Sequence, residues 1–148
     1  MLFESLLLVA AIGFCDGPQA DVSEAPKAET AKPVEAVPLF PAENEIVQWT
    51  NAQRKRHGLP PLVVDASLEK TARNHTFWMA SVQSLQHAQG AWAENIAQGQ
   101  ISAQHAVSSW MNSSGHRANI LNRRHRRIGV AGFVGRNGQV YWCQQFKE

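Results

Sequence analysis

The sequence contains only two cysteines, Cys15 and Cys143, among its 148 residues. Their spacing is neither that of a zinc finger nor that of a redox pair, and two cysteines do not make a disulfide scaffold. The sequence also lacks a glycine-rich phosphate loop, an H-E-x-x-H zinc helix and a G-x-S-x-G nucleophile turn. Any chemistry must therefore come from residues that lie far apart in the chain.

No hydrophobic run reaches the roughly 20 residues that a membrane-spanning helix needs. The short apolar stretch that ends at Phe14 is instead typical of a signal sequence, so residues 1–15 are interpreted as a signal or lipoprotein-type leader. Two alternatives stay open, cleavage at the small residues Ala11 and Gly13 or lipidation of Cys15 in a lipobox-like context. We expect a secreted, periplasmic or cell-envelope protein that contacts a membrane only through a lipid on Cys15.

Residues 16–41 contain five of the seven prolines, many alanines and no apolar periodicity. This composition is typical of an extended, disordered linker. Residues 1–41 carry six acids against two lysines, so the net charge of +2 for the chain leaves an excess of +6 in residues 42–148. The expected organisation is one basic domain over residues 42–148 behind an acidic tether.

Three segments before residue 112 have the pattern of helices. The first is expected over residues 42–57, with Glu43 in its first turn and Arg54 in its last, where both complement the helix dipole. Asp65 and Ser102 are suited to cap the two helices that follow.

The end of the chain has the pattern of a β-hairpin. Strands are expected over residues 128–134 and 139–146, and the Arg-Asn-Gly sequence at residues 136–138 is typical of the tight turn between them. Cys143 is expected to pack as a strand thiol. Helices that precede a terminal hairpin indicate a layered α+β domain.

Residues 108–122 hold the most informative stretch of the domain, Ser-Ser-Trp-Met-Asn-Ser-Ser-Gly-His-Arg-Ala-Asn-Ile-Leu-Asn. A helix is expected to end near Trp110. Asn, Ser and Gly at residues 112–115 favour a turn, because their side chains bond locally or tolerate unusual backbone angles. His116 then opens a second helical run, which places an imidazole at the mouth of a bend.

This stretch resembles the W-x-x-S-x-G-H-R-x-N-I-L signature of bacterial members of the CAP superfamily. These SCP-domain proteins are related to cysteine-rich secretory proteins, venom allergens and plant pathogenesis-related proteins. Further motifs match in the same order: Asn51-x-x-Arg54, Gly58-Leu59-Pro60-Pro61-Leu62, Glu94-Asn95-Ile96-Ala97, Ile128-Gly129-Val130 and Tyr141-Trp142-x-Gln144-x-Phe146. The resemblance covers residues 42–146 and implies a three-layer α-β-α sandwich with a small antiparallel sheet between helices.

In that family two histidines and two glutamates line a central cleft. Matching the motifs places the histidines at His87 and His116 and the first glutamate at Glu94, while the position of the second glutamate holds Ser113. Two neutral imidazoles and a carboxylate can hold a divalent metal such as zinc with positions left for water. The alternative is a hydrogen-bonded cluster that orders the cleft and binds nothing. Trp92 is expected to face a ligand in the same cleft.

The resemblance favours binding over catalysis. The expected function is that of an exported module that binds a small apolar or lipid ligand, an envelope component or a protein partner through this cleft. The alternative is a metal-dependent or serine-type hydrolase that uses His116, Glu94 and Ser113. A serine mechanism needs the hydroxyl, a base and an orienting acid within hydrogen-bonding distance, which spacing alone does not establish.

A run of basic residues follows residues 108–122, namely Arg123, Arg124, Arg126 and Arg127 around His125. A solvated loop is one interpretation. The other is contact with anionic envelope material such as lipid headgroups or acidic glycans. Nucleic acid is not expected as a partner, because no recognisable binding motif accompanies the charge.

Overall fold

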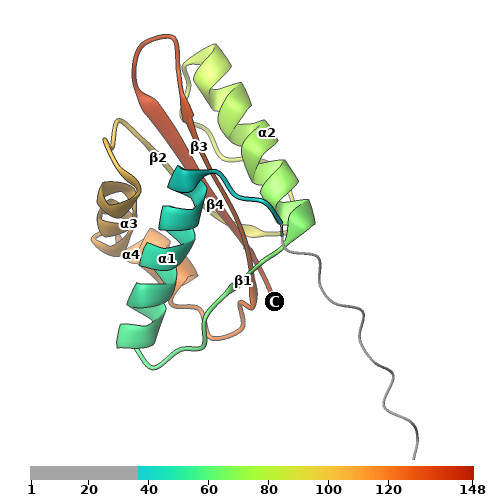
Figure 1. Ribbon diagram of the computed structural model, residues 1–148, viewed down its shortest axis with the longest axis vertical. Coiled ribbons are helices and arrows are strands. Elements are labelled where there is room, and N and C mark those ends of the chain that lie inside the picture. Colours follow the sequence, from blue (N-terminus) through green and yellow to red (C-terminus); the bar gives the residue numbers. More distant parts are fainter. Residues whose placement is uncertain (1–36) are drawn as a thin grey trace, which may run out of the picture. The chain divides into compact units, whose positions relative to one another are not determined.

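The computed structural model describes residues 37–148 (Figure 1). The predicted leader over residues 1–15, Cys15 and the linker up to residue 36 lie outside the described residues. The elements in chain order are α1 (Pro41–Arg56), β1 (Val63–Val64), α2 (Ala66–Val82), β2 (Ala93–Gln98), α3 (Ala103–Met111), α4 (Ser114–Ile120), β3 (Arg127–Val134) and β4 (Val140–Lys147).

The four strands form one sheet in the order β1-β3-β4-β2. The hairpin of β3 and β4 is confirmed, and β2 pairs antiparallel with the other side of β4. The two-residue strand β1 runs parallel to β3, with Val63 opposite Arg127, so the sheet is mixed and not purely antiparallel. Two residues are too few to show an alternating pattern, which is why the sequence did not indicate β1.

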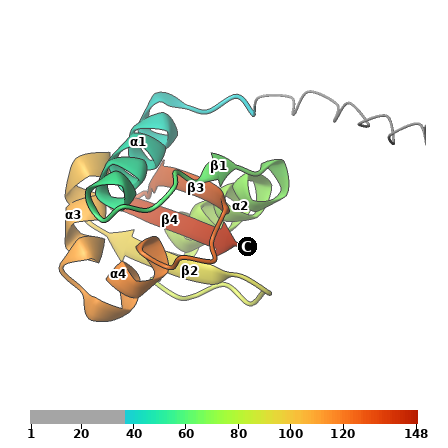
Figure 2. The ribbon, with the colours of Figure 1, turned by 90° about the horizontal axis from the view of Figure 1, so that it is seen from below.

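Helices cover both faces of this sheet, as Figure 2 shows. Helix α2 packs on β3 and β4 from one side, while α1, α3 and α4 lie together on the other. Each interface has its own apolar core; Trp110, Ile128 and Phe146 belong to the first, on the α1 side, and Met79 and Tyr141 belong to the second. The three-layer α-β-α sandwich is therefore confirmed.

Capping residues set where the helices begin. Asp65 accepts hydrogen bonds from the N–H groups of Ser67 and Leu68, and Ser102 accepts one from His105, as expected. Helix α1 begins one residue earlier than predicted, since Pro41 is suited to the first helical position. Helix α4 also begins earlier, at Ser114, because Ser113 takes the extended N-cap conformation and confines the turn to residues 112–113.

Two charged residues that were predicted in the first and last turns of α1 are buried. The guanidinium of Arg54 is fully buried and donates to the carbonyls of Pro60, Ile120, Asn122 and His125 at 2.8–3.2 Å. It therefore ties the end of α1 to the segment that connects α4 with β3. Backbone carbonyls left unpaired in this interior would each cost about 1–3 kcal/mol, so this residue is structural.

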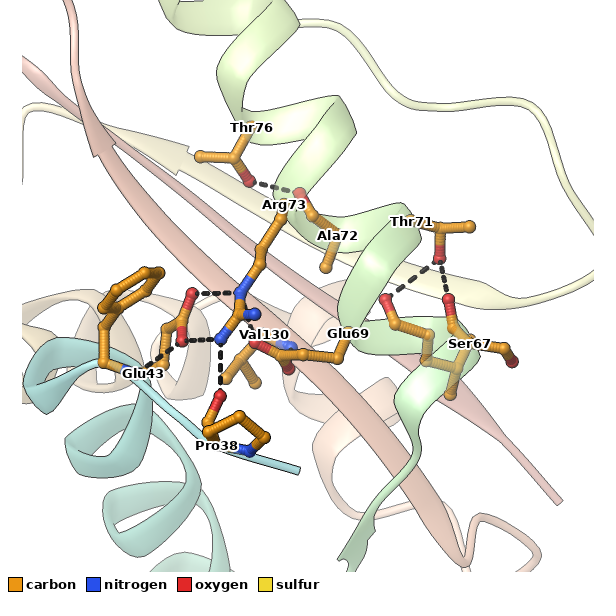
Figure 3. Close-up of polar contacts among 11 residues, drawn as sticks. Pro38, Glu43, Ser67, Glu69, Thr71, Ala72, Arg73, Thr76 and Val130 are labelled. Carbon is orange, nitrogen blue, oxygen red and sulfur yellow. Dashed lines mark hydrogen bonds and ion pairs between the residues drawn. The ribbon is translucent and has the colours of Figure 1, made fainter. Parts of the chain in front are cut away.

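Glu43, the second of these residues, belongs to a polar cluster between α1 and α2 (Figure 3). Arg73 donates to Glu43 at 2.6 and 2.9 Å and to the carbonyl of Pro38 at 2.9 Å. Glu69 also contacts this arginine. Its Oε2 accepts the Val130 N–H at 2.9 Å. Its Oε1 lies 3.1 Å from Arg73 Nε, but the two atoms are not aligned for a hydrogen bond. The cluster joins α1, α2 and β3 through one arginine and two buried carboxyl groups.

The stability of the fold should depend on the protonation of Glu69. The pKa of this carboxyl is raised from 4.5 to about 7, mainly by burial and also by the charge of Glu43, while the Val130 N–H and the charge of Arg73 act in the opposite direction. The folded state thus prefers the protonated form. The stabilisation is complete below pH 4.5 and is lost as the pH rises through about 7, a change on the order of 3 kcal/mol.

Glu69→Gln tests this dependence, because glutamine still accepts the Val130 N–H and carries no charge. We expect the free energy of unfolding of the wild type, measured with urea between pH 4.5 and 7.5, to fall relative to that of the variant as the pH rises. Glu45→Gln, which removes an exposed carboxylate from α1, serves as the control. Parallel curves for wild type and Glu69→Gln would contradict the assignment.

Candidate functional site

The carboxylate of Glu94, the second residue of β2, lies at the centre of the candidate site. Its side chain is 5% exposed. Oε1 accepts from His87 Nδ1 at 2.8 Å and from the Ala88 N–H at 2.9 Å, while Oε2 accepts from Gln145 Nε2 at 2.9 Å and Cys143 Sγ at 3.7 Å. A carboxylate offers about four acceptor positions. All of them are therefore used within the protein.

The neighbours of Glu94 are themselves fixed. Gln145 lies directly opposite Glu94 in the β2–β4 register, and its Oε1 accepts from Thr71 of α2 at 2.6 Å, which orients its amide nitrogen toward the carboxylate. Burial raises the pKa of the Cys143 thiol well above its usual value, and the charge of Glu94 adds to this effect, so the sulfur keeps its proton and donates. The carboxylate is thus held by rigid groups from the sheet.

His87 carries the outward-facing part of this arrangement. Its side chain is 58% exposed. Because the carboxylate of Glu94 can only accept, the ring proton of neutral His87 lies on Nδ1 and the lone pair lies on Nε2. A carboxylate bonded to one imidazole nitrogen is a common way to orient the other nitrogen toward a metal or ligand.

His116 lies on α4, which is fastened to β2 by two asparagines. Asn95 Nδ2 donates to the His116 carbonyl at 3.1 Å, and Asn119 Nδ2 donates to Asn95 Oδ1 at 2.9 Å. The ring is half-buried; burial lowers its pKa, and the charge of a protonated His87 lowers it further. His116 is therefore neutral near pH 7 and is an electrostatic neighbour of His87.

The structure brings two of the three predicted metal ligands, His87 and Glu94, into direct contact, and His116 lies in their neighbourhood. Within residues 37–148, however, no group of three or more His, Cys, Asp or Glu side chains is arranged to hold a metal ion. Glu94 holds His87 in place. The ring nitrogens of His87 and His116 are the groups that can accept a ligand or a metal.

Ser113 and Trp92, the other predicted cleft residues, have mainly structural contacts. Ser113 is the half-buried N-cap of α4, and in the part of the chain that the structure describes no serine hydroxyl is hydrogen-bonded to a histidine ring. The Trp92 ring lies between Gly90, where any Cβ would collide with it, and Lys147, whose Nζ is 5.9 Å from the ring centroid. Trp92 therefore orders the loop that carries His87.

All four arginines of the basic run are exposed, and three of them have a polar contact within the domain. Arg123 and Arg124 are exposed, with Arg124 3.8 Å from Glu148, while Arg126 donates to the carbonyls of Arg123 and His125. Arg127 lies 3.6 Å from Asp65. His125, in the middle of the run, is buried and its ring stacks on Phe146, which the sequence did not indicate.

One apolar cavity of the domain lies away from the residues of the candidate site. A cavity of about 430 Å³ follows the outer edge of β3 between α1 and α2, and exposed rings of Phe40, Phe77 and Phe133 line it. Glu94 and His87 belong to the opposite edge of the sheet, at β2. This β3-edge cavity therefore offers an apolar surface that is separate from His87 and Glu94.

A family model described as the cysteine-rich secretory protein family, CAP, matches residues 47–146. The chain belongs to this family. The uncharacterized protein YkwD of Bacillus subtilis (strain 168) is 37% identical over 121 residues, which are 70% of this chain and 46% of YkwD. The chain therefore spans less than half the length of this relative.

Solved structures agree with the CAP fold. An extracellular protein from Bacillus anthracis str. Ames that contains an SCP domain is 26% identical, with a TM-score of 0.63 over 74% of this chain and 44% of that one. A structure of NaASP2 with Zn2+ has a TM-score of 0.62 at 14% identity, over 71% of this chain and 78% of that one. At that identity the second likeness supports the fold alone. Among residues 37–148 no helix has the length and apolar character needed to cross a membrane.

Proposed function

We propose that this CAP domain is an exported binding module whose ligand docks on the imidazoles of His87 and His116. The observation that carries the proposal is the saturation of Glu94 by four donors. A carboxylate whose acceptor positions are all used is suited to holding a neighbouring ring and has no position free to take a proton from a substrate. The domain therefore presents two groups to a ligand, the outward Nε2 of His87 and the neutral ring of His116.

Export is supported by the relatives. One is described as an extracellular protein with an SCP domain, and another, 31% identical over 71 residues, is the secreted protein RBT4 of Candida albicans. The leader predicted for residues 1–15 agrees with this placement, with Cys15 as the site of a lipid anchor in the alternative in which the leader is a lipoprotein signal.

A polar or metal-mediated ligand suits the two imidazoles better than an apolar one. Neutral imidazole is a common zinc ligand, and the lowered pKa of His116 keeps this ring available for coordination. The structural neighbour NaASP2 is described with Zn2+. Water or an envelope component that carries oxygen donors would complete the coordination of an ion held by two rings.

Zinc is the probe for this site. We expect zinc to raise the Tm of the wild type and to raise it much less in His116→Ala and His87→Ala, because each variant removes one of two ring nitrogens. At a free zinc concentration of 100 times Kd the stabilisation is about 2.7 kcal/mol, which corresponds to several degrees for a domain of this size. Differential scanning fluorimetry with and without a chelator measures the shift.

His105→Ala is the matched control, since His105 is exposed on α3 and takes no part in the site. Its zinc-dependent shift should equal that of the wild type. Equal shifts in the wild type and in His116→Ala would show that zinc binds elsewhere and would remove His116 from the site.

A further inference from the structure

Exposed basic side chains gather at the end of the domain where α1 and α4 finish and β3 begins. The end of α1 and the connection before β3 lie at the bottom of Figure 1. Two of them close α1, one lies on α4 and three belong to the connection before β3. We call this surface the basic end; its members are Lys55, Arg56, Arg117, Arg123, Arg124 and Arg126. We propose that the basic end binds a phosphate-rich polyanion of the cell envelope, independently of the imidazole site.

Buried contacts make one surface out of these separate segments. The guanidinium of Arg54 donates to the carbonyls of Ile120, Asn122 and His125, so the residue before Lys55 is locked to the connection that carries Arg123 and Arg124. The exposed side chain of His57 provides a second connection between α1 and α4. Its Nδ1 is 2.8 Å from the Gln53 carbonyl, and its Nε2 accepts from Arg117 at 3.2 Å.

The tautomer of His57 follows from these two contacts. A carbonyl can only accept, so Nδ1 carries the proton and Nε2 is free to accept from the guanidinium of Arg117. The neutral ring thus lets α1 and α4 bring their basic side chains together without a third charge between them. The geometry is set before any ligand binds, which lowers the entropy that binding must overcome.

Few acids oppose this charge. Asp65 lies 3.6 Å from Arg127 beside the basic end, and Glu148 lies 3.8 Å from Arg124. Both are surface contacts, which typically contribute no more than about 1 kcal/mol. The remaining acids of residues 37–148 are elsewhere: Glu43 and Glu69 share Arg73, Glu94 holds His87, and Glu45 lies in the second turn of α1 at its other end. The positive excess of the domain is therefore concentrated at one end.

The composition of the basic end favours the phosphate groups of an envelope polymer over a membrane surface. Five of its six side chains are arginines, whose planar guanidinium groups bind phosphate oxygens in pairs. A surface that docks on lipid usually adds apolar side chains that enter the bilayer. Here the exposed large apolar residues, apart from Val63 opposite Arg127, lie on other parts of the described domain.

Inorganic polyphosphate is the probe for this proposal, with affinity measured by isothermal titration at 50 and 200 mM salt. We expect binding that weakens steeply with salt. Two double variants, Arg123→Gln with Arg124→Gln and Lys55→Gln with Arg56→Gln, should each lower the affinity at least tenfold. Lys70→Gln with Arg136→Gln removes two exposed charges outside the basic end and should change the affinity less than twofold.

Three results would overturn the proposal. Equal losses in all three double variants would mean that only net charge matters. A loss confined to the Arg123 and Arg124 variant would mean that the basic end is not one surface. Vesicles with phosphatidylglycerol that bind the protein when polyphosphate does not would mean that the partner is a membrane. The zinc-dependent Tm shift of these double variants should equal that of the wild type, because the basic end is separate from the imidazole site. This comparison distinguishes failure of this proposal from failure of the proposed function.

Discussion

Gly129→Ala should destabilise the domain by about 3 kcal/mol or more, with loss of a single well-packed native state. A Cβ at this position in β3 would collide with backbone atoms of Leu68 and Glu69 in α2. Backbone cannot move aside as a flexible side chain does, so α2 would have to separate from the sheet. That separation would also break the bond from the Val130 N–H to the buried Glu69 carboxyl.

Gly115→Ala is the matched control for Gly129→Ala. Gly115 lies in the first turn of α4, and a Cβ there would meet nothing within 4 Å. Alanine is the better helix former, so this variant should be neutral or more stable by up to about 1 kcal/mol. Urea denaturation followed by tryptophan fluorescence compares the two. Similar free energies of unfolding for both variants would show that α2 and β3 are not in close contact at Gly129.

Arg54→Met should cost about 3 kcal/mol or more, the second large effect expected. Methionine fills much of the space but leaves the carbonyls of Pro60, Ile120, Asn122 and His125 without their donor. Arg54→Lys should rescue only part of the loss, because a single ammonium cannot reproduce the fork of a guanidinium. The connection before β3 should also become mobile, which hydrogen exchange of residues 121–126 would show.

Arg56→Met provides the comparison within the same helix. Arg56 is exposed, so its replacement should change the free energy of unfolding by less than about 0.5 kcal/mol. If Arg54→Met were equally mild, the buried guanidinium would contribute little and the basic end would lack the support that we assign to it.

Local features of the sequence were sufficient to predict much of the fold. Caps at Asp65 and Ser102 depend on a side chain and the N–H groups two or three residues later, so the chain segment itself carries the information. The hairpin turn near Gly138, where φ is +74°, is local in the same way. The layer order came from the resemblance to the CAP family, because no local pattern specifies which face a helix covers.

What the sequence could not show depends on partners distant in the chain. Arg54 at the end of a helix has the pattern of a solvated cation, and only carbonyls about 70 residues later explain why it is buried. Glu94 was identified by motif, but its role follows from Gln145 and Cys143 across the β2–β4 register, which sequence does not fix. Gln145 and Cys143 lie on the same face of β4, on either side of Gln144, and the pattern of this strand gave no other signal.

The account depends most on His87 and His116 as the ligand-facing groups, and histidine nitrogen NMR tests this directly. In a two-bond ¹H–¹⁵N correlation near pH 7, we predict that neutral His87 has its proton on Nδ1 and that zinc shifts the ring nitrogens of His87 and His116 while those of His105 stay unchanged. A His87 ring protonated on Nε2, or zinc shifts confined to other histidines, would contradict the account.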